Sequence, residues 1–185
     1  LLGPNSRFLD KKINLGLDLQ GGSYLLLEID NSPVIEQKIQ NISTIIRSYF
    51  KEKNIGLGNL VLSNQKISFT VNEKFKQIVI DEFRDENSNI NPYYPRFKSH
   101  QLDIVEAGSN LELSFSKQGL IELKTSSQDQ ALEIVRRRID EIGTNEPNIL
   151  KRGNDRILVE LPGLDDPMRI KSLLGKTANL TFRFV

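Results

Sequence analysis

The sequence predicts an α+β fold in which one order of elements, strand-helix-strand-strand-helix-strand, occurs twice along the chain. Short segments alternate apolar and polar residues with the period of a strand, and longer segments repeat apolar residues at the three- and four-residue steps of a helix. Turn residues separate these segments in the same order in both halves. With 38% hydrophobic residues, the 185-residue chain can form one larger or two small domains with buried cores.

The first occurrence of this order covers residues 23–109. Its first helix has a clear start, because Ser32 can cap a helix and Pro33 suits the first helical position. The second helix follows Asn72, another residue favoured as a cap. The expected elements are a strand at 23–30, a helix after Ser32, hairpin strands at 59–62 and 66–71, a helix after Asn72 and a strand at 102–106.

The second occurrence covers residues 110–185. Gly143 is the expected stop of its long helix, since glycine readily adopts the left-handed conformation that ends helices. The expected elements are a strand at 111–115, a helix at 117–142, hairpin strands at 146–151 and 156–161, a short helix opened by Asp166 and Pro167, and a strand at 178–185.

This order is that of the split βαβ, or ferredoxin-like, unit. The predicted fold class is therefore α+β, with two consecutive ferredoxin-like (βαββαβ) units whose antiparallel sheets are each covered by helices on one face. Residues 1–22 are expected to form a lead-in that ends in the turn GLDLQGG. The chain opens with Leu1 rather than Met, so we expect it to be part of a longer protein.

Composition excludes several kinds of chemistry. The 25 Lys and Arg residues balance 24 Asp and Glu residues, which disfavours nucleic acid and anionic membranes as partners. Without cysteine the chain has no disulfide, thiol nucleophile or Cys/His zinc site. A Ser/His/Asp triad could use only His100, which lies beside a Tyr-rich loop and is expected at the surface. No apolar run approaches the roughly 20 residues of a membrane span, so any such segment is expected outside these residues.

Segments that resemble catalytic or nucleotide-binding motifs fail the spacing that the chemistry requires. Residues 175–177 (GKT) lack the glycine that a P-loop carries five residues before Gly175, because position 170 is Ile170. The turn GLDLQGG lacks GxGxxG spacing and precedes a strand instead of following one. The pair Asp165 and Asp166 is better explained as a helix cap than as an acid-base pair. We therefore predict no catalytic, cofactor-binding or metal-binding residue.

Arg136, Arg137 and Arg138 form the one basic cluster. Steps of about 100° per residue around a helix spread these side chains apart, and Glu133 and Glu141 are spaced to pair with Arg137. A solvated, ion-paired helix face is the favoured interpretation. The alternative is an autonomous ferredoxin-like ligand- or RNA-binding module, whose central strands would need stacking aromatics, but the hairpin strands offer only Phe69. A small hydrolase of this fold is a third possibility, for which the sequence nominates no residue.

Two separated blocks carry a family resemblance. Residues 14–23 read NLGLDLQGGS and are followed by LLLEID, and residues 131–185 contain RRRIDEIGTNEPNILKRGNDRILVELPG and then LLGKTANLTFRF. Both blocks resemble the SecD family of bacterial protein-export subunits, with Thr144 and Asn145 as a local departure from its pattern. Residues 32–109 resemble, in position and length, an extra region found in many Gram-negative members. The family-motif positions are Leu17, Asp18, Leu19, Gln20, Gly21, Gly22, Arg136, Arg138, Gly143 and Pro147.

The resemblance implies the base of the first periplasmic domain of an inner-membrane protein, without its head subdomain and with the membrane reached through segments outside this chain. Its implied partners are SecF, the SecYEG channel and the translocating unfolded preprotein, with no nucleic acid and no cofactor. The implied role is non-enzymatic, because the residues that carry protons for the proton motive force lie in transmembrane helices. We further hypothesise that residues 17–22 fix the base relative to the membrane helix, and that edge strands add an extended client by main-chain pairing. The sequence does not identify the polypeptide-binding residues.

Overall fold

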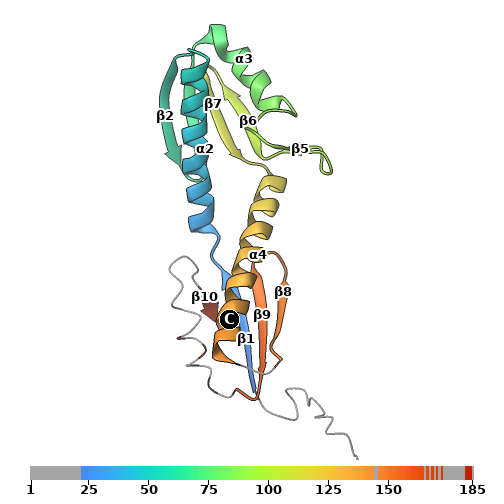
Figure 1. Cartoon of the computed structure of the whole chain (residues 1–185). Coiled ribbons are helices and arrows are strands. Elements are labelled where there is room, and N and C mark those ends of the chain that lie inside the picture. The colour runs from blue at the N-terminus through green and yellow to red at the C-terminus, as the bar shows by residue number, and fades with distance from the viewer. Residues whose placement is uncertain are drawn as a thin grey trace, which may run out of the picture.

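The computed structural model describes residues 22–143, 146–164, 166, 168, 170, 172 and 182–184. Within these residues the chain forms three long helices, a short helical segment that includes residues 168, 170 and 172, and ten strands. The strands make up two four-stranded sheets and one two-stranded hairpin. Figure 1 shows the two larger sheets at opposite ends of the molecule, with helix α4 (Lys117–Ile142) spanning the distance between them.

One sheet, together with the C-terminal half of α4, forms what we call the base unit. Its strand order is β10-β1-β9-β8, and every neighbouring pair is antiparallel. Alternate residues of β1 point to the core, where Leu27 is 1% exposed and packs with Val135 and Ile139 of α4, both fully buried. The strands are β1 (Gly22–Ile29), β8 (Asn148–Arg152), β9 (Arg156–Pro162) and β10 (Phe182–Phe184).

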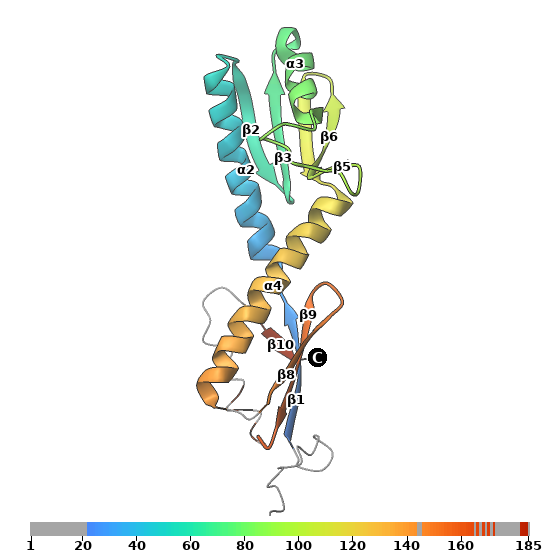
Figure 2. The ribbon, with the colours of Figure 1, turned by 45° about the vertical axis from the view of Figure 1, so that its right-hand side comes forward.

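The other sheet belongs to the inserted unit, which lies in sequence between β1 and α4. Its strand order is β2-β3-β7-β6, and helices α2 and α3 bury one of its faces (Figure 2). At the core the ring of Phe69 lies 5.6 Å from that of Phe50 and 6.4 Å from that of Phe83. The elements are α2 (Ser32–Glu52), β2 (Leu57–Ser63), β3 (Lys66–Val71), α3 (Glu73–Arg84), β4 (Tyr93–Tyr94), β5 (Ser99–His100), β6 (Leu102–Ala107) and β7 (Asn110–Phe115).

The predicted helix signals are largely confirmed. Asn72 caps α3, since its Oδ1 accepts a hydrogen bond of 3.0 Å from the backbone N–H of Lys74. Gly143 ends α4 in the left-handed conformation, with φ of 73°. The expected cap of α2 is wrong by one residue, because Asn31 occupies the N-cap position and Ser32 is already helical.

The two consecutive ferredoxin-like units are not confirmed, although the α+β class and the antiparallel pairing are. Strand β1 pairs with β9, with Leu25 opposite Val159, whereas β7 pairs with β3 and β6. The first strands of the two expected units have thus exchanged sheets, so residues 23–109 and 110–185 do not coincide with the two sheets. The exchange of β1 and β7 between the two sheets could not be predicted from the sequence. Hydrophobic alternation shows which face of a strand is buried but not which strand lies beside it.

The base unit nevertheless keeps the order that was expected of the second half. Strand β1, α4, β8, β9 and β10 follow one another as in a split βαβ unit that is interrupted after its first strand. Met168, Ile170 and Ser172 are helical where a short helix was expected, and Ile170 is buried in the base core. Of the last expected strand, only residues 182–184 lie within the described part of the chain.

Candidate functional site

The family-motif residues that the structure describes do not form one cluster. Leu17, Asp18, Leu19, Gln20 and Gly21 lie outside the described residues. Gly22 begins β1 opposite Pro162, with φ of 152°, a backbone conformation that residues with a side chain rarely adopt. The next residue, Ser23, donates a hydrogen bond of 2.5 Å to the carbonyl oxygen of Leu164, so the start of β1 is fixed to the segment after β9.

On α4, Arg136 is exposed and Arg138 is half-buried. Arg136 pairs with Glu133 at 2.9 Å and Arg138 with Glu141 at 3.4 Å. The ion-paired helix face is confirmed, but the predicted arginine was wrong. Glu133 and Glu141 pair with Arg136 and Arg138 and not with Arg137. The helix then ends at Gly143, where an added Cβ would meet nothing within 4 Å, so the left-handed backbone rather than space favours glycine. Pro147, half-buried, directly precedes β8.

Helix α4 is shared by both units. Leu120 and Leu123 in its N-terminal half pack against the core of the inserted unit, and Ala131 and Val135 in its C-terminal half belong to the core of the base unit. Between them lies Gln128, which is 2% exposed. Its Nε2 donates to the carbonyl oxygens of Gly153 at 3.1 Å and Arg156 at 2.7 Å. The burial of Gln128 was not predicted from the sequence, because a polar residue within a helix is normally expected at the surface.

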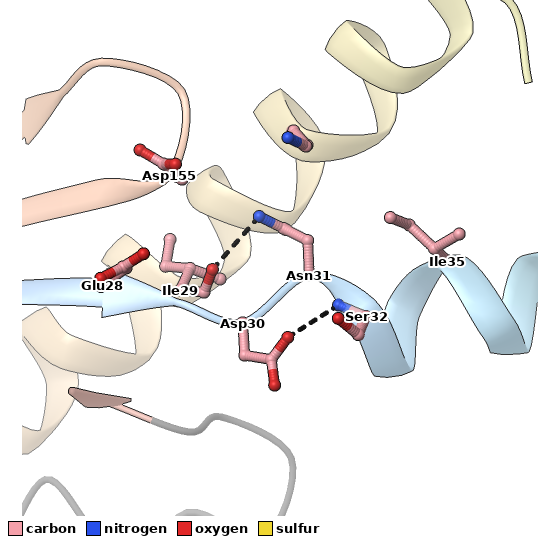
Figure 3. Close-up of a pocket in the computed structure, with 8 residues that line it drawn as sticks. Glu28, Ile29, Asp30, Asn31, Ser32, Ile35 and Asp155 are labelled. Carbon is pink, nitrogen blue, oxygen red and sulfur yellow. Dashed lines mark hydrogen bonds between the residues drawn. The ribbon is translucent and has the colours of Figure 1, made fainter.

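The connection from β1 to α2 borders a polar hollow between the units (Figure 3). The backbone N–H of Ile29 donates to the carbonyl of Asp155 at 2.7 Å, and that of Ser32 donates to Asp30 Oδ1 at 2.9 Å. Oδ1 of Asn31 is buried without a hydrogen-bond partner among the described residues. The hollow has a volume of about 360 Å³ and is lined by Glu28, Asp30, Asn31, Ser32, Lys124 and Asp155, among others.

The hollow carries three carboxylates against one ammonium group. Their arrangement is not that of a metal site, since no group of three or more His, Cys, Asp or Glu side chains suited to an ion occurs among the described residues. Asp30 also has a structural role, because a carboxylate that accepts from the first N–H of a helix compensates its dipole. The junction is therefore a polar gap lined mainly by charged and amide side chains.

Both sheets present edge strands. Strands β2 and β6 bound the inserted sheet and β8 and β10 the base sheet, and an edge strand leaves half of its main-chain groups unpaired. Apolar side chains are exposed on three of these strands, namely Val61 on β2, Val105 on β6 and Leu150 on β8. A bulge between Gly58 and Val61 interrupts β2. The edge strands are thus candidates for the expected pairing with an extended polypeptide.

The β4–β5 hairpin forms an exposed surface that was not predicted from the sequence. Phe97 at its tip is 44% exposed. Below the tip the rings of Tyr93 and His100 lie 4.8 Å apart, and His100 Nε2 lies 3.1 Å from the carbonyl oxygen of Arg84. His100 is therefore half-buried and not the surface residue expected. Burial and the carboxylate of Glu122 raise the pKa of Tyr94 above its usual value.

The stacking surface of an RNA-binding sheet is not present in the described part of the inserted sheet. Phe69, the aromatic residue of the hairpin strands, is fully buried against the helices. The opposite face of β3 carries Ser68 and Thr70. No described helix is long and apolar enough to cross a membrane.

The described part of the chain thus consists of two helix-covered sheets that share one long helix, with open sheet edges and an exposed hairpin. Residues 128–185 match the family model "Protein translocase subunit SecDF, P1 domain, N-terminal", and residues 8–33 match "SecD/SecF GG Motif". The chain belongs to the SecD family.

Similar proteins extend this match over nearly the whole chain. The protein translocase subunit SecD of Rickettsia felis is 37% identical over 183 residues, which cover 98% of this chain and 33% of that protein. SecD of Acetobacter pasteurianus is 34% identical over 178 residues, covering 95% of this chain and 33% of that protein. The chain therefore spans about a third of the length of the curated relatives it matches. An autonomous ligand- or RNA-binding protein is accordingly not favoured.

Proposed function

We propose that the chain is a periplasmic scaffold of a SecD accessory subunit, which assists protein translocation across the bacterial inner membrane. Its proposed partners are SecF, the SecYEG channel and the translocating preprotein. The role is non-enzymatic, and the energy comes from the proton motive force through residues outside this chain. The similarity to SecD proteins over nearly the whole chain supports this role.

The observation that carries the mechanism is that one helix has its two halves in different cores. The 26 residues of α4 extend about 39 Å at 1.5 Å per residue. Leu123 lies against the inserted core and Val135 in the base core. Because packed cores resist deformation, a movement of the base unit is passed along α4 to the inserted unit.

The same observation supports a division into two domains that differs from consecutive halves. We assign residues 22–31 and the chain from the middle of α4 onward to a base domain. Residues 32–116, with the first turns of α4, form an inserted domain. The lead-in over residues 17–22 would fix the base domain relative to the membrane helix, since its last residue, Gly22, already pairs with Pro162 of β9.

The test interrupts α4 without removing either core. A Gly-Gly-Ser-Gly insertion between Ser126 and Ser127 is introduced into the full-length protein, which is expressed in cells depleted of their own SecD. The matched control carries the same insertion in the turn between β6 and β7, after Gly108. Export is measured as the rate of signal-peptide removal from a pulse-labelled preprotein.

We expect the insertion in α4 to slow export severalfold and the control insertion to leave it near normal. Equal export by the two variants would contradict transmission through α4. Normal export in depleted cells that express no SecD at all would contradict the proposed function itself.

A further inference from the structure

The tip of the β4–β5 hairpin has a fixed shape. Figure 1 shows this hairpin extending sideways from the inserted sheet, next to the start of α4. The backbone N–H of Phe97 donates to the carbonyl of Tyr94 at 3.0 Å, and that of Lys98 donates to Pro95 at 3.3 Å. Lys98 adopts a left-handed conformation with φ of 49°. Two hydrogen bonds and a proline thus define the turn that presents residues 96–98 to solvent.

The hairpin is also fastened at its base. Asn91, 1% exposed, donates to the carbonyls of Phe83 and Leu102 and accepts from the N–H of Leu102. Ser116 donates to the carbonyl of His100 at 2.6 Å. At Gly119 of α4 an added Cβ would lie 2.1 Å from the carbonyl oxygen of Gln101, so helix and hairpin are in close contact. A surface held in this way loses little conformational entropy when it binds.

The exposed side chains of the tip are one aromatic ring and two cations. The guanidinium of Arg96 lies 5.4 Å from the centre of the Phe97 ring. Both Arg96 and Lys98 are exposed, and neither forms an ion pair within the described part of the chain. Aromatic residues and arginine are enriched in protein interfaces and dominate their binding energy.

We propose that this tip is a docking site for an acidic segment of polypeptide that carries an apolar residue, which would contact Phe97 while its carboxylates pair with Arg96 and Lys98. The proposal rests on the function proposed above only in taking a polypeptide as the natural ligand. It adds a contact site in the inserted unit to the edge strands considered earlier.

A narrow polypeptide segment fits this tip better than a broad anionic surface. Polybasic lipid-binding clusters carry roughly four to eight cations and nucleic-acid sites make about six to ten phosphate contacts, whereas the tip offers two cations. Glu86 lies beside Tyr93 and Glu122 beside Tyr94, and both tyrosines belong to β4, the strand that leads into the tip. Because these carboxylates lie at the base of the hairpin, they would repel a broad anionic surface more strongly than a short acidic segment that contacts only residues 96–98.

Fluorescence anisotropy tests the proposal with the purified 185-residue chain. The probe is a fluorescein-labelled, unstructured peptide of about 15 residues in which Asp and Glu surround one Leu, and its matched counterpart carries Asn and Gln instead. The variants are Phe97→Ala, Arg96→Ala and Lys98→Ala. The control, Ile45→Ala, removes an apolar side chain of α2 that is exposed to the same degree as Phe97 and lies on no edge strand. Far-UV circular dichroism verifies that each variant is folded.

We expect the acidic peptide to bind at least tenfold more tightly than its amide counterpart. Phe97→Ala should weaken binding about tenfold or more, each cation variant about two- to fivefold, and Ile45→Ala not at all. Absence of binding, equal binding of the two peptides, or a Phe97→Ala variant that binds like the unchanged chain would overturn the proposal. Binding to phosphatidylglycerol vesicles but not to the peptide would overturn the assignment of a polypeptide ligand. None of these results bears on the export assay above, so the two proposals can fail separately.

Discussion

Replacing Gln128 with glutamate should destabilise the attachment of α4 to the base unit. The Nε2 amide of Gln128 donates to two carbonyl oxygens, those of Gly153 and Arg156, and the side chain is 2% exposed. A glutamate would place a buried carboxylate against the same two acceptors and lose both hydrogen bonds. Each lost hydrogen bond costs about 0.5–1.5 kcal/mol, so the amide alone contributes about 1–3 kcal/mol. The unpaired buried charge raises the cost beyond that range.

Gln130 supplies the matched control, because it lies two residues further along α4 and is exposed. Gln130→Glu makes the same chemical change and should alter the free energy of unfolding by less than about 0.5 kcal/mol. The measurement is urea denaturation followed by far-UV circular dichroism. Hydrogen exchange adds a local readout, since the amides of the β8–β9 turn should lose protection only in Gln128→Glu. Equal unfolding free energies of the two variants would refute the anchoring role of Gln128.

Three further changes test other parts of the structure. Gly119→Ala should destabilise the protein by about 1–3 kcal/mol in urea denaturation, because its Cβ would overlap the carbonyl of Gln101. The control, Gly56→Ala, should be neutral, because an added Cβ there meets no atom within 4 Å. Equal effects of the two changes on the free energy of unfolding would contradict the close contact between Gly119 and Gln101. Asn91→Ala should lower the melting temperature by several degrees, as it leaves buried main-chain groups of the hairpin base unpaired; an unchanged melting temperature would show that these bonds are dispensable. Changing both Gly21 and Gly22 to Val in the full-length protein should reduce export even if the purified chain folds, and normal signal-peptide processing would count against a role of this turn.

The secondary structure could be predicted closely because its determinants are local. Asn72 caps α3 and Gly143 ends α4 as their residue types indicate, and the buried faces of the strands follow from alternation. The pairing of the strands could not be predicted in the same way. Strands β1 (GSYLLLEI) and β7 (NLELSF) carry the same alternation, so the pattern allows either to join either sheet.

The candidate surfaces were less predictable than the fold for a related reason. Strands β4 and β5 have two residues each, which is too short for any periodicity to appear. The residues that fasten the hairpin and α4, Asn91 and Gln128, are polar side chains that look like surface residues in a sequence. Their importance comes from burial among main-chain carbonyls that are 8 to 28 residues away along the chain.

The attachments along α4 give the proposed transmission a defined route. At the N-terminal end, Ser116 and Gly119 hold the β4–β5 hairpin. In the middle of α4, Gln128 is hydrogen-bonded to Gly153 in the turn between β8 and β9. Val135, further toward the C-terminal end of the helix, lies in the base core. A force applied at the hairpin tip therefore reaches the base unit through one continuous helix instead of through flexible loops. If the tip binds a moving polypeptide, Gln128→Glu should reduce export while peptide binding at Phe97 remains unchanged. Loss of export without loss of binding is expected if α4 transmits force from the tip to the base unit. It is not expected if the tip is only a binding site.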